Sequence, residues 1–166
     1  MKKCEKVVMG PLMFGPKIDI TDPCYDRDVW CRMNDVEIVP GDYTAIAYLK
    51  DTGGWGKRVA TLGIYLNGIV PKVQDMHMFR EGIGVDAGMA GFFEGKPDFT
   101  DDQWGNFCDM CRDAGYPSVF CEDHGLFHGF CSSSGYGDGG YPVFVARNAK
   151  GEICALEIRF LSNHRT

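Results

Sequence analysis

Apolar and polar residues alternate over much of the chain with the two-residue period of a β-strand. Residues 17–20 and 42–50 each present one apolar face, as half-buried strands do. Residues 57–67 are apolar on both faces, which is typical of an inner strand of a sheet sandwich. Residues 141–147 and 152–160 alternate again on either side of a short turn that contains glycine, and this pattern predicts a hairpin.

One segment has the period of a helix instead. Thr100 and Gln103 have the spacing of a capping box, in which both side chains bond free backbone N–H groups at the helix start. Gly115 and Pro117 end the helix, because glycine accepts the turn that follows and proline cannot continue it. The apolar face of this helix is made by Trp104, Phe107, Cys108 and Cys111. A short helical turn is also expected within residues 26–32.

The predicted strands clearly outnumber the helices. We therefore expect a mainly β (α+β) fold, an antiparallel sheet sandwich with one or two short helices packed on it. The length of 166 residues suits a single domain over 1–166. Within it, residues 94–131 are interpreted as a helix-containing, cysteine-rich insert.

Composition narrows the class of partner. Hydrophobic residues make up 45% of the chain, which is enough for a sizeable core. The net charge is −6 and no cluster of basic residues is present, which argues against nucleic acid as a partner. No apolar run reaches membrane-spanning length and no signal-peptide core is visible, so we expect a cytoplasmic protein without a membrane partner. Eight cysteines in such a chain are expected to be reduced and mostly buried. The sequence indicates neither a cofactor nor an oligomeric state.

The glycine-rich stretch from Ser132 to Pro142 is the most unusual segment. It holds four glycines, three serines, two tyrosines and one carboxylate, Asp138. A connection between two strands needs only two to five residues, and glycine allows a ligand to approach the backbone closely. The loop between a strand ending near Ser133 and one starting near Tyr141 is therefore a candidate site.

Two further turns carry an aspartate where a predicted strand stops, one at Asp22 and one at Asp86. If the three turns meet, their carboxylates form an acidic pocket that suits a cation, amino groups or sugar hydroxyls. The alternative is structural, because aspartate side chains in turns commonly accept hydrogen bonds from nearby backbone N–H groups. The predicted ligand-binding residues are Asp22, Tyr25, Asp86, Ser134, Tyr136, Asp138 and Tyr141.

These residues favour a module that binds a small polar ligand. One alternative is a hydrolase that uses the same carboxylates on a phosphoester or glycosidic bond. Another is a structural or interaction protein of phage origin, in which the glycine-rich loop only closes a sheet. No catalytic residue follows from the sequence, because it lacks a nucleophile elbow, a phosphate-binding loop with its lysine, and the His-Asp clusters of common phosphoesterases.

The cysteines suggest a second kind of site. Zinc has a candidate ligand set of the right size in Cys108, Cys111, Cys121 and His124, with His128 and Cys131 as further ligands. Cys108 and Cys111, however, fall inside the predicted helix, where cysteines three residues apart also serve as small apolar core residues. We therefore expect buried thiols and no stoichiometric zinc.

Several of these motifs together resemble a known family. They are Asp22-Pro23-Cys24-Tyr25, Pro40-Gly41-Asp42-Tyr43, the segment from Val85 to Phe92, and the segment from Ser133 to Val143. The chain resembles the domain of unknown function 4241 family of bacteria and their phages, from about Asp19 to Phe160. The resemblance implies a single cytoplasmic domain that includes the glycine-rich loop. It implies no reaction and does not support a zinc site between Phe107 and Cys131.

Overall fold

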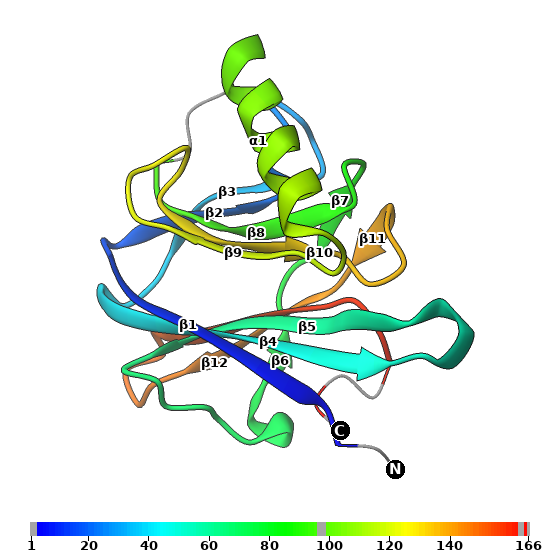
Figure 1. Cartoon of the computed structure of the whole chain (residues 1–166). Helices are drawn as coiled ribbons and strands as arrows, with labels where there is room; N and C mark the ends of the chain where they lie inside the picture. Colours follow the sequence, from blue (N-terminus) through cyan, green and yellow to red (C-terminus); the bar gives the residue numbers. More distant parts are fainter. Residues whose placement is uncertain (1–2, 96–98, 163–164, 166) are drawn as a thin grey trace.

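Two antiparallel sheets pack face to face in the computed structural model, which describes residues 3–95, 99–162 and 165 (Figure 1). Strands account for 47% of the described residues and helices for 13%, so the mainly β prediction is confirmed. The described residues contain one α-helix, which covers the outer face of the smaller sheet (Figure 1).

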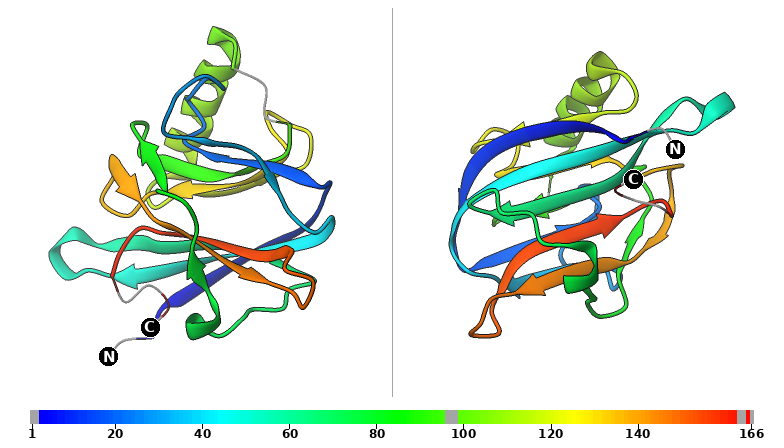
Figure 2. Two further views of the ribbon diagram at one scale, coloured as in Figure 1. Left: turned by 180° about the vertical axis from the view of Figure 1, so that it is seen from behind. Right: turned by 90° about the horizontal axis from the view of Figure 1, so that it is seen from below.

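The larger sheet has six strands in the order β1-β4-β5-β13-β12-β6, and Figure 2 shows it from below. These strands are β1 (Glu5–Phe14), β4 (Gly41–Asp51), β5 (Lys57–Leu66), β13 (Ile153–Arg159), β12 (Val143–Arg147) and β6 (His77–Met78). The segment predicted to be apolar on both faces is β5, and it lies inside this sheet between β4 and β13. The predicted C-terminal hairpin is formed by β12 and β13.

The smaller sheet has five strands in the order β3-β2-β8-β10-β9. These are β3 (Met33–Glu37), β2 (Lys17–Thr21), β8 (Met89–Phe93), β10 (Gly129–Ser133) and β9 (Val119–Glu122). Two short strands, β7 (Ile83–Val85) and β11 (Gly139–Tyr141), form a separate ribbon at one end of the sandwich (Figure 1).

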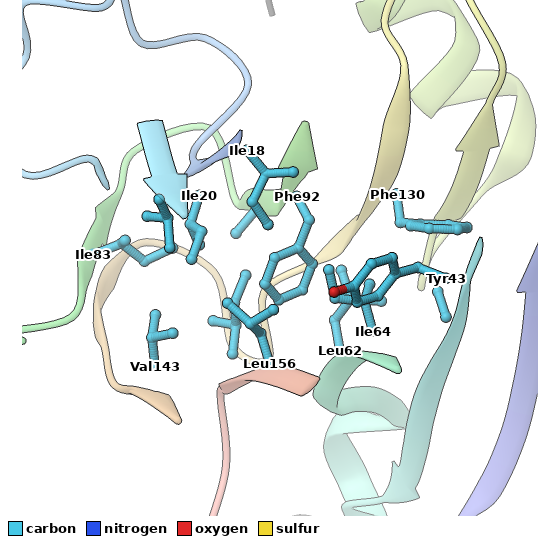
Figure 3. Close-up of a cluster of buried hydrophobic side chains, with 14 of the residues drawn as sticks. Ile18, Ile20, Tyr43, Leu62, Ile64, Ile83, Phe92, Phe130, Val143 and Leu156 are labelled. Atoms are coloured by element: carbon cyan, nitrogen blue, oxygen red, sulfur yellow. The ribbon is translucent and has the colours of Figure 1, made fainter. Parts of the chain in front are cut away.

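The core between the two sheets is aliphatic and aromatic. Ile18 and Ile20 of β2 and Phe92 of β8 lie opposite Leu62 and Leu156 of the larger sheet (Figure 3). Burying one side chain of this size contributes about 1.5–3 kcal/mol, so this layer accounts for much of the driving force for folding.

The outer face of the larger sheet holds a buried polar network. Glu157 of β13 is fully buried and accepts hydrogen bonds from Tyr65 (2.8 Å) and Arg159 (2.9 Å), and it also pairs with Arg165. The Arg159 guanidinium lies 3.7 Å from the ring centroid of Phe144. Burial, followed by the nearby Glu157 carboxylate, raises the pKa of Tyr65 well above its ordinary value, so Tyr65 remains a hydrogen-bond donor.

Helix α1 (Asp101–Ala114) begins and ends as predicted. The Thr100 side chain accepts a hydrogen bond from the N–H of Gln103, the Gln103 side chain accepts one from the N–H of Thr100, and Gly115 follows the last turn. Phe107 is the buried residue of the helix and packs on Phe120 and Phe127. The remainder of 94–131 contributes β9 and the first half of β10 to the smaller sheet.

Three expectations about local structure are wrong. Residues 26–32 form turns and no helix. Cys108 is exposed and Cys111 half-buried, because α1 touches the sheet mainly through Phe107. Of the eight cysteines, only Cys4 and Cys131 are buried, so the thiols are not mostly in the core.

None of the helices in the described part of the chain has the length and apolar character needed to cross a membrane.

Candidate functional site

Two of the three predicted aspartate turns face one open cleft of about 860 Å³ at the β7–β11 ribbon. Asp86 follows β7 and Asp138 precedes β11, and pairing of these two strands brings both carboxylates to the same cleft. Tyr25 lines the cleft as predicted. Sequence reasoning missed two further contributors, Glu81 and the indole of Trp30, which is 89% exposed. The described residues that line it include three carboxylates and neither lysine nor arginine, so the cleft favours positive charge.

Asp22 lies behind this cleft and has a structural role. Its side chain is fully buried, and one carboxylate oxygen accepts hydrogen bonds of 2.7 Å from the backbone N–H groups of both Asp86 and Ala87. The other oxygen accepts a 2.8 Å hydrogen bond from the N–H of Cys24. Asp22 therefore fixes the backbone of the Asp86 turn and presents that residue to the cleft.

Tyr25 is held at the wall of the cleft. Burial raises the pKa of Tyr25, and hydrogen bonds with the Cys31 thiol and the Asp86 carboxylate raise it further. The phenol thus stays protonated, and its hydrogen bond orients Asp86. Cys31 comes this close because residue 84 is glycine, since a Cβ there would lie 2.6 Å from Cys31 Sγ.

Two predicted residues of the glycine-rich loop shape the loop itself. Ser134 is fully buried, and its hydroxyl donates a 2.8 Å hydrogen bond to the carbonyl of Gly137. The Tyr141 hydroxyl donates to the same carbonyl at 2.6 Å and to the carbonyl of Ser134 at 3.1 Å. Burial raises the pKa of Tyr141, which preserves this donor. Both hydroxyl hydrogens are therefore used in bonds within the loop.

Tyr136 points to a different cavity, of about 560 Å³, next to helix α1. There the guanidinium carbon of Arg58 lies 4.6 Å from the ring centroid of Tyr116 and 5.7 Å from that of Tyr136. Trp104 and Phe107 of α1 form apolar walls. This aromatic cavity was not predicted, because Arg58 comes from β5 and no local pattern connects it to the other residues.

The two cavities share one wall, which consists of residues 85–88 and 134–140. Asp86 and Asp138 face the acidic cleft, whereas Gly88 and Gly137 face the aromatic cavity. The N–H of Ser134 donates a 3.0 Å hydrogen bond to the carbonyl of Gly88 and joins the two halves of the wall. The glycine-rich loop thus separates two cavities. Of the seven predicted ligand-binding residues, three line the acidic cleft, namely Tyr25, Asp86 and Asp138.

The candidate zinc ligands Cys108, Cys111, Cys121 and His124, from which we expected no zinc site, are not brought together. Among the described residues, the group of His, Cys, Asp and Glu side chains whose ligand atoms converge consists of Asp123, His124 and His128. It shares only His124 with the set that contains Cys108, Cys111 and Cys121. Burial, followed by the adjacent Cys108, raises the pKa of Cys111 to about 11, which disfavours the thiolate that zinc requires.

Comparison with known proteins identifies a family without assigning an activity. No significant match was found among curated proteins or among solved structures. A family model described as "Protein of unknown function (DUF4241)" matches residues 72–158, more than half of the chain, including the whole wall between the cavities. The motifs at Asp22 and Pro40 lie outside the matched region. The chain therefore belongs to the DUF4241 family, as its motifs predicted.

Proposed function

We propose that this protein binds a small polar ligand with a protonated or quaternary amino group in the acidic cleft. The observation that carries the proposal is the convergence of the exposed carboxylates of Asp86, Asp138 and Glu81 beside the exposed indole of Trp30. Carboxylates attract an organic cation, and a tryptophan face adds a cation–π contact of about 0.5–2 kcal/mol. The eight cysteines, all present as thiols, support a reducing, cytoplasmic location as part of the same proposal.

Binding is favoured over hydrolysis through the same carboxylates. Metal-assisted hydrolysis needs a group of side chains that holds the ion in the cleft. Among the described residues, the three that converge in this way lie in the loop 123–128 and not in the cleft. We therefore assign no reaction to Asp86 or Asp138.

The test is a titration of the full chain with choline and with ethanolamine. Binding is monitored through the NMR chemical shifts of the backbone amides and the tryptophan indoles. We expect shifts at residues 82–86 and 138–140 and at the Trp30 indole. The double variant Asp86→Asn/Asp138→Asn removes two charges from the cleft and is expected to weaken binding by about 10-fold, because two exposed ion pairs together contribute roughly 1.4 kcal/mol.

The matched control is Asp42→Asn/Asp109→Asn, which removes the same two charges from exposed positions that do not line the cleft. It is expected to bind like the natural sequence. Shifts at Arg58, Tyr116 and Met89 would place the ligand in the aromatic cavity and contradict the proposal. Equal weakening in both double variants would show only a general charge effect and would also contradict it.

A further inference from the structure

We propose that Asp123, His124 and His128 form a binding site for a divalent transition metal of the zinc type. All three lie in the loop between β9 and β10, and one ligand atom from each is within 4.8 Å of the other two. The Asp123 carboxylate oxygen is 3.2 Å from Nδ1 of His128 and 3.9 Å from Nδ1 of His124. The two imidazole centroids are 4.3 Å apart.

The orientation of His128 carries the argument. Its side chain is only 8% exposed, and Nε2 lies 2.7 Å from the backbone carbonyl of Met13. A carbonyl only accepts, so Nε2 carries a hydrogen, and Nδ1 is the ring nitrogen left to offer a lone pair to a metal. This Nδ1 is buried without a hydrogen-bond partner and faces the Asp123 carboxylate. A lone pair on Nδ1 and the Asp123 carboxylate repel each other at this distance unless a cation, either a metal ion or a proton, lies between them.

The surroundings of His128 are those of a metal-binding histidine. Such a histidine usually donates its second ring N–H to a carbonyl or carboxylate, which fixes the tautomer and the ring plane. Here the Met13 carbonyl accepts that hydrogen bond, and a Glu94 carboxylate oxygen lies 4.0 Å from the same nitrogen. The ring of Phe14 meets the imidazole edge-on, with centroids 5.5 Å apart. Strand β1 therefore holds the ring before any metal arrives.

The backbone of the loop brings His124 to the same point. His124 has a φ of +61°, a left-handed conformation that is unfavourable for a residue other than glycine. This conformation places the exposed His124 ring beside the buried His128 ring.

The donor set selects the class of metal. Two imidazole nitrogens and one carboxylate oxygen suit Zn²⁺ and its neighbours Co²⁺ and Ni²⁺, whereas Ca²⁺ and Mg²⁺ prefer oxygen ligands alone. Three protein ligands leave a fourth position open, as in zinc sites that also hold water or substrate. The inference departs from the expectation of no stoichiometric zinc, which rested on the cysteines as ligands.

This site is independent of the proposed function. It precedes β10, whereas the wall that lines the acidic cleft follows β10, so the two sites lie at opposite ends of the same strand. Loss of amine binding and loss of zinc binding would therefore be separate results.

The test is calorimetric titration of Zn²⁺ into untagged full-length protein that has been stripped with a chelator. We expect one Zn²⁺ per chain. His124→Ala and Asp123→Asn are expected to lower the affinity by about 10-fold or more. Their side chains are 75% and 71% exposed, so an unchanged melting temperature without metal would show that both variants remain folded.

Two controls separate this site from the other candidate ligands. His77→Ala removes an exposed histidine of β6, and the triple variant Cys108→Ser/Cys111→Ser/Cys121→Ser removes the cysteine set. Both are expected to keep the affinity of the natural sequence. The Co²⁺ complex is expected to lack thiolate-to-cobalt charge-transfer absorption.

Three outcomes would overturn the proposal. They are the absence of Zn²⁺ binding between pH 6 and 8.5, the loss of binding in the cysteine variant, and unchanged binding in both His124→Ala and Asp123→Asn. The first would mean that a proton on Nδ1 of His128, and not a metal, occupies the gap beside Asp123.

Discussion

The backbone N–H of Asp86 donates a 2.7 Å hydrogen bond to the buried carboxylate of Asp22, across 64 residues of sequence. Both residues were predicted to bind a ligand, yet only Asp86 faces the cleft. The buried carboxylate takes the place of solvent for the N–H groups of a sharp turn, and it thereby determines where the exposed carboxylate points.

Asp22→Asn is expected to lower the free energy of unfolding by about 2–3 kcal/mol. An asparagine has one acceptor oxygen for three backbone N–H groups, and its own NH₂ group would face at least one of them. Urea denaturation measures the change. Asp138→Asn is the matched control, because Asp138 is exposed and its loss should change stability by no more than about 0.5 kcal/mol. Equal effects of the two substitutions would contradict the role given to Asp22.

Glu157→Gln is expected to lower the free energy of unfolding by about 3 kcal/mol or more. The substitution leaves Arg159 and Arg165 without a buried counter-charge on the outer face of the larger sheet. The comparison is Glu152→Gln in the exposed turn after β12. Its free energy of unfolding should differ from that of the natural sequence by no more than about 0.5 kcal/mol. If Glu157→Gln unfolds at the same urea concentration as Glu152→Gln, the network does not stabilise the sheet.

Gly105→Ala is expected to stabilise the protein by about 0.5–1 kcal/mol. Gly105 lies within α1 with open space around it, and alanine loses less backbone entropy on helix formation. By contrast, a Cβ on Gly91 would lie 2.2 Å from the carbonyl oxygen of Phe130 in the neighbouring strand. Gly91→Ala should therefore strongly destabilise the protein. Relative to the natural sequence, the melting temperature should rise for Gly105→Ala and fall for Gly91→Ala.

Alkylation of Cys111 is expected to be slow until the pH approaches 11. Its pKa is raised to about 11 by burial and by the adjacent Cys108. A raised pKa means that the folded state holds the proton over a pH range in which the unfolded chain releases it, so the thiolate is scarce between pH 9 and 11. At pH 9 the folded protein should react several tens of times more slowly at Cys111 than the urea-unfolded chain. Iodoacetamide labelling with peptide mapping measures both rates, and similar rates would contradict the burial of this thiol.

Local patterns predicted most of the secondary structure. The capping box of α1 and the two-sided apolar pattern of β5 depend on neighbouring residues, and both are present in the structure. The Cys108 prediction failed because an apolar stripe only shows which face is apolar. The depth of contact depends on the partner, and α1 meets the sheet at Phe107.

The site was predicted only for residues that lie next to paired strands, because those residues are brought together by the sheet itself. Asp86 and Asp138 meet because the short strands beside them pair, and the glycine-rich loop drew attention to one of these strands. The structural role of Asp22 was one of two alternatives that the sequence left open, since buried and exposed aspartates look alike in a turn motif. His124 and His128 carried a usable signal in their four-residue spacing, but the search for cysteine ligands left Asp123 out.

The single wall between the acidic cleft and the aromatic cavity has a thermodynamic consequence. A displacement of residues 85–88 or 134–140 that widens one cavity narrows the other, because the same backbone borders both. We expect a ligand in the aromatic cavity to change the affinity of the cleft for choline, and choline to change the affinity of the aromatic cavity for that ligand by the same factor. If the affinity for choline is the same with and without the second ligand, the wall is rigid. Two ligands that never touch would then each lower the affinity for the other through the wall that both cavities share.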